Sequence, residues 1–415
     1  MPLFTQLFLI LLAFGTLLQF WLLLRHLDHV ARHRGEVPRE FNDRVDLEAH
    51  QKAADYTRSK GKPAVIEIFL SVALLLFWTL GGGLDLLDHY WRGFDPEEVI
   101  GGIAFIFSFF FINSLLDLPF SLYRTFRIEA AFGFNRISPA QYLKDRLLSL
   151  LLAILLGGPL LWVILQLMAG AGNYWWLAAW AVWMGFSLTL SWAYPRLIAP
   201  LFNTFTPLDE GKMRERIQGL LQRCGFTSDG IFVMDGSKRS SHGNAYFTGF
   251  GKSKRIVFFD TLLEALSVEE MEAVLAHELG HFHYKHIYKQ MALTALLSLA
   301  GMALLGWLTQ QPWFYSSLGI TQPSNAAALL LFILTIPVFT IFFAPLGSYL
   351  SRRYEFQADN YAVNQTKGEF LVQALVKLYQ DNASTLTPDP LYSLFHDSHP
   401  PAPARIAQIT QQNSG

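Results

Sequence analysis

The sequence predicts a mostly α-helical membrane protein in which seven transmembrane helices carry a small α+β domain on the cytosolic face. The first reason is composition: the 415 residues are 52% hydrophobic and 16% charged, whereas soluble chains are about a quarter charged. The second is pattern, because the charges lie in short polar stretches between apolar runs long enough to cross a hydrocarbon core about 30 Å thick. The third is one long polar stretch between the fifth and sixth runs, which must fold on its own.

Charge and cysteine content exclude several classes of protein. The formal net charge of −1 gives no electrostatic reason to expect nucleic-acid binding. Cys224 is the only cysteine, so neither a disulfide framework nor a thiolate metal cluster is expected. Any metal ion must therefore be held by histidine and carboxylate side chains.

The N-terminal membrane region is predicted to cover residues 1–194 and to contain five transmembrane helices. The first apolar run, Leu3–Leu24, has neither a basic segment before it nor an evident small-residue cleavage site, so we interpret it as a retained helix and not as a signal peptide. A polar loop, Arg25–Lys62, follows it. The other transmembrane helices are expected near residues 64–85, 99–118, 146–169, 174–194, 288–309 and 326–350.

The Lys and Arg content of the loops predicts the orientation in the membrane. The loop Arg25–Lys62 and the loop after the third helix are rich in these residues, whereas Asp85–Glu98, after the second helix, holds only Arg92. Loops rich in Lys and Arg remain on the cytosolic side. The N-terminus is therefore expected outside, and the polar stretch between the fifth and sixth helices is expected in the cytosol.

This cytosolic insertion, residues 195–287, is predicted to be an α+β domain. Met213–Arg223 has the spacing of a short amphipathic helix, and strands are expected at Ile231–Met234, Ala245–Thr248 and Arg255–Phe259. A further helix follows the strands. We expect it to run directly into the sixth transmembrane helix.

The C-terminal part of the chain is predicted to complete the same domain. Residues 288–350 hold the sixth and seventh transmembrane helices, and residues 351–415 follow them on the cytosolic side. The seventh helix is expected to continue through Ala362. Two more helices are expected, one near Gly368–Tyr379 and one from about Pro403.

The insertion contains the motif His277-Glu278-Leu279-Gly280-His281. Ser267 and Glu270 form a capping box that starts the helix on which it lies. Histidines four residues apart share one face of a helix, where both can bind one zinc ion. Glu278 is not a ligand in this pattern but is placed to take a proton from zinc-bound water. The alternative, a buried helix whose histidines pair with carboxylates, explains neither the spacing nor the adjacent glutamate.

Two histidines leave a catalytic zinc site one protein ligand short. His283 and His286 are close in sequence but fall on other faces of a continuous helix. Glu355, on the predicted helix beyond the seventh span, is the best candidate because it returns to the same membrane face. The alternative is that Glu355 forms a solvated ion pair with Arg352 or Arg353.

Asp359 lies one turn beyond Glu355 on the same face of that helix. A histidine that binds zinc through one ring nitrogen usually donates the other N–H to a carboxylate or carbonyl. We therefore expect Asp359 to support a ligating histidine and not to bind the metal itself.

Taken in order, these and further motifs resemble the integral-membrane zinc endopeptidases that include the type I CAAX prenyl proteases. The resemblance covers nearly the whole chain. The motifs that carry it are Leu118-Pro119-Phe120, Ile128-Glu129, Phe132-Gly133-Phe134-Asn135, Tyr194-Pro195, Pro200-Leu201-Phe202-Asn203, Pro207-Leu208, Asn244-Ala245-Tyr246-Phe247, Lys254-Arg255-Ile256-Val257, Phe259-Asp260-Thr261-Leu262-Leu263, His277-Glu278-Leu279-Gly280-His281, Glu355-Phe356-Gln357-Ala358-Asp359 and Ser398-His399-Pro400-Pro401. The resemblance implies one Zn²⁺ per chain, with Glu355 as its third ligand.

The resemblance also implies that the seven helices enclose a large water-filled chamber within the membrane. Such a chamber would explain Glu67, Asn113 and Asp117, which lie in or beside predicted spans although such groups rarely face lipid. The alternative for Glu67 and Asp117 is that their side chains reach the membrane surface from the ends of the spans.

By resemblance, His399 reaches the zinc site and stabilises the oxyanion of the tetrahedral intermediate, and Arg405 lies on the same side of the site. The alternative is a loop histidine with a purely structural role. The resemblance further implies that Asn244, Ala245, Tyr246 and Phe247 form an edge strand that pairs with an extended substrate. The alternative there is an ordinary hairpin strand.

These motifs leave three functions to compare for this chain. The first is a membrane-embedded zinc endopeptidase that, by resemblance, removes the C-terminal tripeptide from prenylated CAAX peptides. The second is a quality-control protease for misfolded or translocation-stalled membrane proteins. The third is a channel, transporter or inactive scaffold with structural zinc, although structural zinc sites normally have four protein ligands and leave no role for Glu278.

The expected partners are a peptide or protein substrate, prenylated or otherwise membrane-associated, and the lipid bilayer, with the chain acting as a monomer. The compact insertion, and a tail Gln411–Gly415 without an evident retrieval signal, favour a bacterial inner membrane. In a eukaryote we would expect the endoplasmic reticulum. The physiological substrate is not predicted.

Overall fold

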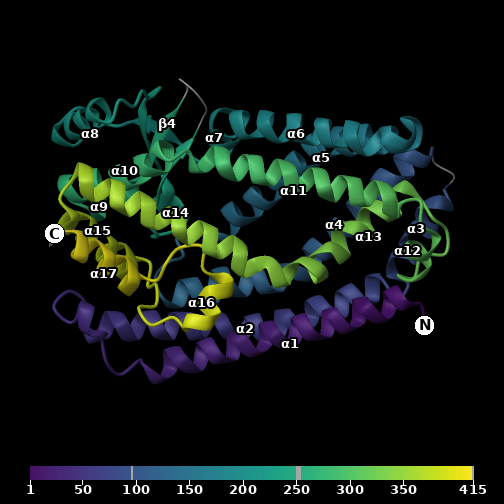
Figure 1. Ribbon diagram of the computed structural model, residues 1–415, viewed down its shortest axis with the longest axis horizontal. Coiled ribbons are helices and arrows are strands. Elements are labelled where there is room, and N and C mark those ends of the chain that lie inside the picture. The colour runs from purple at the N-terminus through teal and green to yellow at the C-terminus, as the bar shows by residue number, and fades with distance from the viewer. Residues whose placement is uncertain (95–96, 249–253, 414–415) are drawn as a thin grey trace.

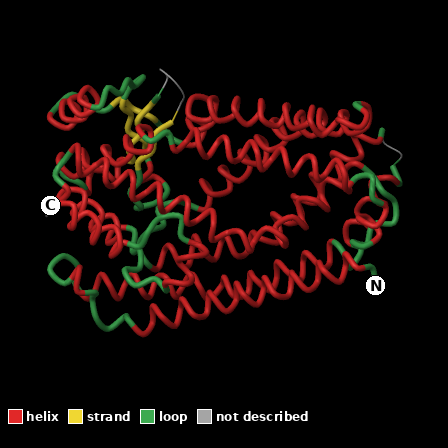
Figure 2. The backbone as a smooth tube through the Cα atoms, in the orientation of Figure 1, coloured by secondary structure: helices red, strands yellow, loops and turns green. Residues whose placement is uncertain are grey.

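The computed structural model describes residues 1–94, 97–248 and 254–413. Long helices lie side by side, and a small sheet lies at the end of the molecule where the described chain finishes (Figures 1 and 2). The helices are α1 Leu3–Arg32, α2 Leu47–Trp78, α3 Gly83–Arg92, α4 Glu98–Tyr123, α5 Pro139–Gly170, α6 Trp175–Ala193, α7 Ala199–Phe202, α8 Lys212–Arg223, α9 Asp260–Ala265, α10 Val268–His283, α11 His286–Leu308, α12 Pro312–Ser316, α13 Asn325–Thr340, α14 Ala344–Gln365, α15 Gly368–Asp381, α16 Pro390–His396 and α17 Ala402–Asn413. The strands are β1 Phe205–Pro207, β2 Ile231–Met234, β3 Ala245–Thr248 and β4 Arg255–Phe259.

Six described helical segments are long and apolar enough to cross a membrane: α1, α2, α4 with its extension to Glu129, α5, α11, and α13 with α14. The remaining predicted span is α6, which packs against α5 and α11 (Figure 1). Its 19 residues are rich in tryptophan, whose polar N–H lowers its rank on hydropathy scales although most of the ring is hydrocarbon. All seven predicted spans are therefore helical, which confirms a multi-pass membrane protein.

Two loops predicted from their charge are largely helical, and those predictions are wrong. In Arg25–Lys62, α1 continues to Arg32, and α2 begins at Leu47 after Asp46 caps it by accepting from the Ala49 N–H at 2.6 Å. Lys, Arg and Glu are good helix formers, so the spans extend beyond the membrane as solvated helices. The second span accordingly ends at Trp78, and α3 occupies much of Asp85–Glu98, of which residues 95 and 96 lie outside the described part.

The predicted seventh span is not one continuous helix. α13 ends at Thr340, a 3₁₀ turn covers Ile341–Phe343, and α14 begins at Ala344. Pro345, in the first turn of α14, has no N–H for the carbonyl four residues earlier, so the helix breaks there. As predicted, α14 continues past Ala362, and it carries the end of the span into the sheet-bearing end of the molecule.

A second break separates α10 from α11, where we predicted one helix. α10 ends at His283, and Lys285 adopts a left-handed conformation with φ 57° before α11 begins at His286. Two consecutive backbone positions thus change the direction of the chain next to the motif.

The sheet has the order β1-β2-β4-β3. β2 is parallel to β4, while β1 and β3 are antiparallel to their neighbours. The three predicted strands are confirmed at their predicted ends, and β1 is a further short strand. β3 is an edge strand, paired on one side only among the described residues, and it begins directly after the exposed Asn244.

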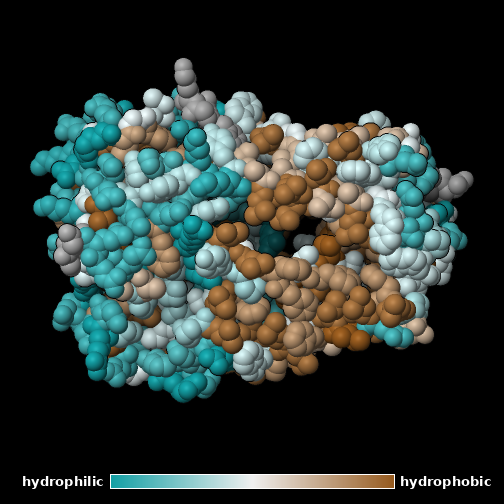
Figure 3. All heavy atoms as spheres, viewed as in Figure 1, coloured by the Kyte–Doolittle hydropathy of each residue, from teal (hydrophilic) through white to brown (hydrophobic). Residues whose placement is uncertain are grey.

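Surface hydropathy divides the molecule into zones. Figure 3 shows an apolar band between a polar end that carries the sheet and a second polar end near α3 and α12, and the surface is hollowed within that band. An apolar band of this kind is what lipid contact requires. The hollow agrees with the chamber implied by the resemblance.

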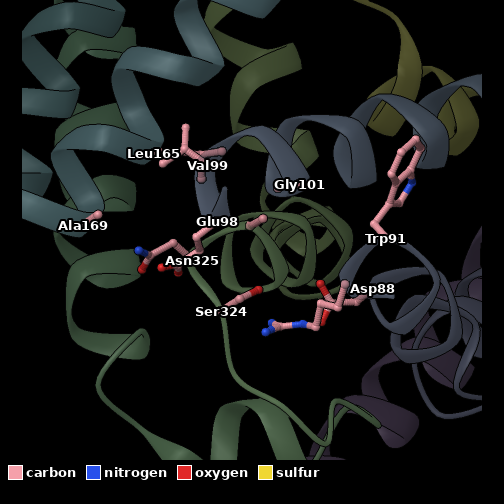
Figure 4. Close-up of a pocket in the computed structure, with 12 residues that line it drawn as sticks. Asp88, Trp91, Glu98, Val99, Gly101, Leu165, Ala169, Ser324 and Asn325 are labelled. Atoms are coloured by element: carbon pink, nitrogen blue, oxygen red, sulfur yellow. The ribbon is translucent and has the colours of Figure 1, made fainter. Parts of the chain in front are cut away.

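A separate cavity of about 340 Å³ lies at the end of the bundle opposite the sheet. It opens between the first turns of α4 and α13, and Figure 4 shows Asp88, Glu98 and Asn325 around it. Arg92 and Asp88 form an ion pair at 2.6 Å on its wall. This cavity is remote from the sheet, so it plays no part in the site described next.

The polar residues within the spans have polar partners. Arg124, in the π-helical extension of α4, lies 3.0 Å from a Glu67 oxygen and 3.6 Å from an Asp117 oxygen. Asn113 accepts a hydrogen bond from Trp78 Nε1 at 3.2 Å. The membrane segments therefore bury or pair these groups instead of presenting them singly to lipid.

Candidate metal centre

Three side chains from two neighbouring helices converge at the cytosol-predicted end of the bundle. His277 and His281 lie on successive turns of α10, and Glu355 lies on α14 beside it. The two Nε2 atoms are 3.3 Å apart, and each lies 3.3–3.4 Å from a Glu355 oxygen. One ligand atom from each residue falls within 4.8 Å of the other two, which is a suitable size for one metal ion.

Gly280 allows α10 and α14 to approach this closely. A Cβ at this position would lie 2.8 Å from Ala358 Cα, closer than real Cβ atoms come, and 3.1 Å from Ala358 O, which is also tight. The glycine within the motif therefore has a packing role, since any side chain would push Glu355 away from the histidines. The capping box from Ser267 and Glu270 is present and starts α10 as predicted.

A buried ion pair orients His277 from behind. Asp359 Oδ1 accepts from His277 Nδ1 at 2.8 Å, and Arg405, on α17, donates to both Asp359 oxygens at 2.6 and 2.8 Å. Asp359 is fully buried and Arg405 nearly so. Burial alone would lower the pKa of the guanidinium, but the Asp359 carboxylate outweighs it and raises the Arg405 pKa above its ordinary value, so Arg405 is charged.

The electrostatics of the three convergent residues suit a cation. Burial opposes the charged form of His277, yet the nearby carboxylates of Asp359 and Glu355 raise its pKa to about 9. Glu355 Oε2 is buried and has no hydrogen-bond partner among the described residues. Such an orphaned oxygen is costly unless something else pairs with it. A divalent ion held by two imidazoles and this carboxylate would satisfy it.

His286 belongs to the same cluster, contrary to the prediction from a continuous helix. The left-handed turn at Lys285 brings His286 Nδ1 to 3.1 Å from His281 Nδ1. The other ring nitrogen lies 2.8 Å from Gln357 Oε1, and the ring stacks on Tyr354 at 4.1 Å. His286 therefore supports His281 much as Asp359 supports His277.

A cavity of about 400 Å³ connects the three convergent residues to the start of β3. The half-buried Glu278 faces it from α10, and Asn244 and Ala245 line its other side. Tyr246 and Phe247, further along β3, do not line it. Phe247 packs on Phe226 and Phe282 at ring distances of 5.7 and 5.1 Å, so its side chain serves the domain core.

His399 and Arg405 line the same cavity from the C-terminal segment. His399 Nε2 lies 3.5 Å from Glu355 Oε1, and its side chain is 64% exposed. Its Nδ1 is held 3.0 Å from Ser398 Oγ. The exposed His399 ring at the mouth of the site can contact a bound molecule, whereas Arg405 is buried and donates its hydrogen bonds to Asp359.

Models of two protein families match almost the whole chain. The model of peptidase family M48 matches residues 207–413. The model of the CAAX prenyl protease N-terminal region, described as five membrane helices, matches residues 26–204. The boundary between the two lies at the start of the sheet.

Named relatives and a solved structure agree with these models. CAAX prenyl protease 1 homolog of Arabidopsis thaliana is 35% identical over 391 residues, covering 90% of each chain. The protein of the same name from Oryza sativa subsp. japonica is 39% identical over 399 residues, covering 93% of each chain. The crystal structure of S. mikatae Ste24p superposes with a TM-score of 0.88 at 31% identity, covering 97% of this chain and 98% of that one.

Proposed function

This chain belongs to peptidase family M48, and we propose that it is a zinc endopeptidase that removes the C-terminal tripeptide from prenylated CAAX peptides. Family membership and the five-helix membrane region make it a membrane-embedded metallopeptidase. The observation that carries the proposal is the convergence of His277, His281 and Glu355 next to Glu278 in one cavity. The names of the relatives supply the substrate class.

Zinc fits the residues that converge here. Two imidazole nitrogens and one carboxylate oxygen are a donor set of catalytic zinc sites, which keep a fourth position open. His277, His281 and Glu355 would hold the ion, with Asp359 fixing the ring of His277. Zinc, when bound, supplies a Lewis acid that polarises the scissile carbonyl and lowers the pKa of water from ~15.7 towards ~7.

Glu278 is the residue that moves protons in this proposal. Its carboxylate faces the cavity one position after His277 and is not one of the three convergent ligand residues. It takes the proton from the attacking water and later delivers it to the leaving amine.

His399 stabilises the charge that develops on the carbonyl oxygen. Its exposed ring lies at the edge of the cavity, with Nε2 3.5 Å from Glu355 Oε1. From there a ring N–H can donate a hydrogen bond to the carbonyl oxygen of the substrate. Arg405 is a positioning residue in this proposal, because its shortest contacts are to Asp359 and its next is to His277 Nδ1 at 3.3 Å. It keeps the site compact without meeting the substrate.

The substrate lies along β3 as an added strand. Asn244 is exposed at the mouth of the cavity, and β3 is paired on one side only among the described residues. An extended peptide can hydrogen-bond to such an edge independently of its side chains. Tyr246 and Phe247 contribute their backbone to this edge in the proposal, and Asn244 holds the peptide near the cleaved bond.

We place the sheet and the metal residues on the cytosolic face, with residues 195–287 and 351–415 forming one protease domain. The Lys and Arg content of the loops supports this orientation. Single cysteines introduced near residue 240, in a chain whose Cys224 is replaced, would test it by labelling in sealed vesicles of known orientation. Labelling from the outside would overturn it.

The test of the proposed function measures zinc per chain together with cleavage of a farnesylated CAAX peptide and its unmodified form. Wild type and Glu278→Gln are compared. We expect one zinc in both proteins and cleavage by wild type only, faster for the farnesylated peptide. Zinc without cleavage of either peptide would favour the quality-control function, and absence of zinc would reject the mechanism.

A further inference from the structure

The segment just before β3 is clamped by a loop from the membrane region. Residues 133–136 follow the extension of α4, and they run beside residues 239–241. Asn135 and Ser240 form an isolated antiparallel bridge. The N–H groups of Arg136 and Ser241 donate across it, at 3.0 and 3.1 Å. This clamp leads the chain directly to His242 and then to the start of the edge strand.

The side chain of His242 connects three separate elements. Its Nε2 lies 3.4 Å from Glu129 Oε2, at the end of the α4 extension. Its Nδ1 lies 3.1 Å from Asn382 Oδ1, just after α15. The ring stacks on Phe134 at 4.4 Å with an interplanar angle of 28°. His242 is thus held on both edges and on one face.

Asn382 links this histidine to the cavity. Its Nδ2 lies 3.5 Å from the carbonyl oxygen of Gly243, which can only accept a hydrogen bond. That carbonyl orients the amide, so Oδ1 must face His242 and accept from it. Asn382 also lines the same cavity as Asn244 and Glu278. One amide therefore fixes the backbone at the exact point where the edge strand begins.

Both ring nitrogens of His242 have partners that can accept a hydrogen bond. These acceptors are a carboxylate and an amide oxygen, and only the imidazolium has two N–H groups to donate. Glu129 is held in turn by the Tyr56 hydroxyl, which donates to Oε1 at 2.6 Å. Two cations lie here: the Lys60 ammonium is 3.9 Å from the centre of the Tyr56 ring, and the Lys52 ammonium is 5.0 Å from the centre of the Phe134 ring. The pair is charge-assisted and only partly exposed.

We propose that His242, held between Glu129 and Asn382, is a positioning residue that sets the start of β3 for the backbone of the substrate. It does not touch the three metal-binding candidates. Its ring instead determines where Gly243 and Asn244 lie relative to the cavity. The proposal rests on the proposed function, because it assumes that a peptide pairs with this edge.

The test compares His242→Gln and Glu129→Gln with wild type, using the farnesylated CAAX peptide. Glutamine at position 242 cannot hydrogen-bond to Glu129 and Asn382 at once. The start of β3 therefore loses these contacts, while the three metal-binding candidates keep theirs. We expect KM to rise about tenfold, as for loss of one charged hydrogen bond, with kcat within about twofold and zinc content unchanged. The double variant should be no worse than either single one, because both break the same link.

A second substrate separates positioning from general damage. A peptide with an N-methyl group at the amide expected to pair with β3 cannot form that hydrogen bond. Wild type and His242→Gln should then show the same KM. His89→Gln is the matched control, because His89, on α3 at the opposite end, has side-chain partners only within its own helix among the described residues.

Binding can be measured without turnover, which keeps this inference separate from the proposed function. Fluorescence anisotropy of the labelled peptide on Glu278→Gln and on the double variant with His242→Gln should give a Kd about ten times weaker for the latter. Equal Kd values, or a fall in kcat or zinc content in place of a rise in KM, would overturn the positioning role. If wild type binds the peptide in this way but cleaves nothing, only the proposed function fails.

Discussion

Asp359 Oδ1 lies 2.8 Å from Nδ1 of His277, and this contact determines which ring nitrogen faces Glu355. Because the carboxylate accepts at Nδ1, that nitrogen keeps its proton, and Nε2 is the nitrogen that would give up its proton to bind a metal ion. Two N–H groups of Arg405 hold the carboxylate in turn. A chain of three buried side chains from α10, α14 and α17 thus presets one metal-binding nitrogen.

Replacing Asp359 with Asn should weaken metal binding, and it should also lower stability because it leaves the buried Arg405 without its carboxylate partner. An amide of the same shape can still meet His277 but no longer stabilises its proton as a carboxylate does. We expect metal affinity to fall about 10–100-fold, measured by competition with a chelator of known affinity. Glu369→Gln, an exposed carboxylate on α15, is the control and should change nothing. An unchanged affinity for Asp359→Asn would contradict the role given to this residue.

Arg405→Met should destabilise the protein strongly. It leaves the fully buried Asp359 carboxylate without its cationic partner, and breaking such a pair costs about 3–5 kcal/mol. The measurement is the midpoint of thermal unfolding in detergent. Adding Asp359→Asn to Arg405→Met removes the unpaired charge and should recover part of the loss. A double variant less stable than Arg405→Met would show that the charge is not the cause.

Glu278→Gln and Glu355→Gln should separate catalysis from metal binding. Glu278 is not one of the convergent residues, so its substitution should keep the metal and reduce kcat by about 10²–10⁴-fold, as for loss of a general base. Glu355→Gln should lose most of the metal, because the carboxylate with the orphaned oxygen is removed. Elemental analysis measures the metal content of each variant, and a peptide-cleavage assay measures its kcat. Full metal content in Glu355→Gln would reject Glu355 as a ligand.

The parts of the fold that the sequence predicts are those that depend on local pattern. Seven apolar runs and three strands follow from composition and alternation, and the ends of those three strands are confirmed. β1 was missed because three residues ending in Pro207 show no alternation. Pro345 indicates the break before Ala344. The length of the apolar run nevertheless favoured the prediction of one continuous helix.

The site likewise contains some relations that follow from local sequence pattern and others that do not. The relation of His277 to His281 is local, so spacing alone predicts it, and the approach of Glu355 is consistent with a helix returning to the same face. The contact between Asp359 and Arg405 joins different helices, so no local pattern contains it, and only the resemblance suggested the site for Arg405. The position of His286 beside His281 was not predicted for a different reason. The turn at Tyr284 and Lys285 contains neither Gly nor Pro, the residues that usually indicate a turn in a sequence.

The turn at Lys285 provides the last prediction. A non-glycine residue at φ 57° is held in a conformation that costs about 1–2 kcal/mol, and glycine adopts it freely. Lys285→Gly should therefore raise the free energy of unfolding by up to about 1 kcal/mol and keep His286 beside His281. Lys285→Pro cannot reach this φ, so it should displace His286 and lower metal affinity. Lys289→Gly, within α11, is the matched control and should destabilise by about 1 kcal/mol. If Lys285→Gly destabilises as much as Lys289→Gly, the left-handed turn is not what positions His286.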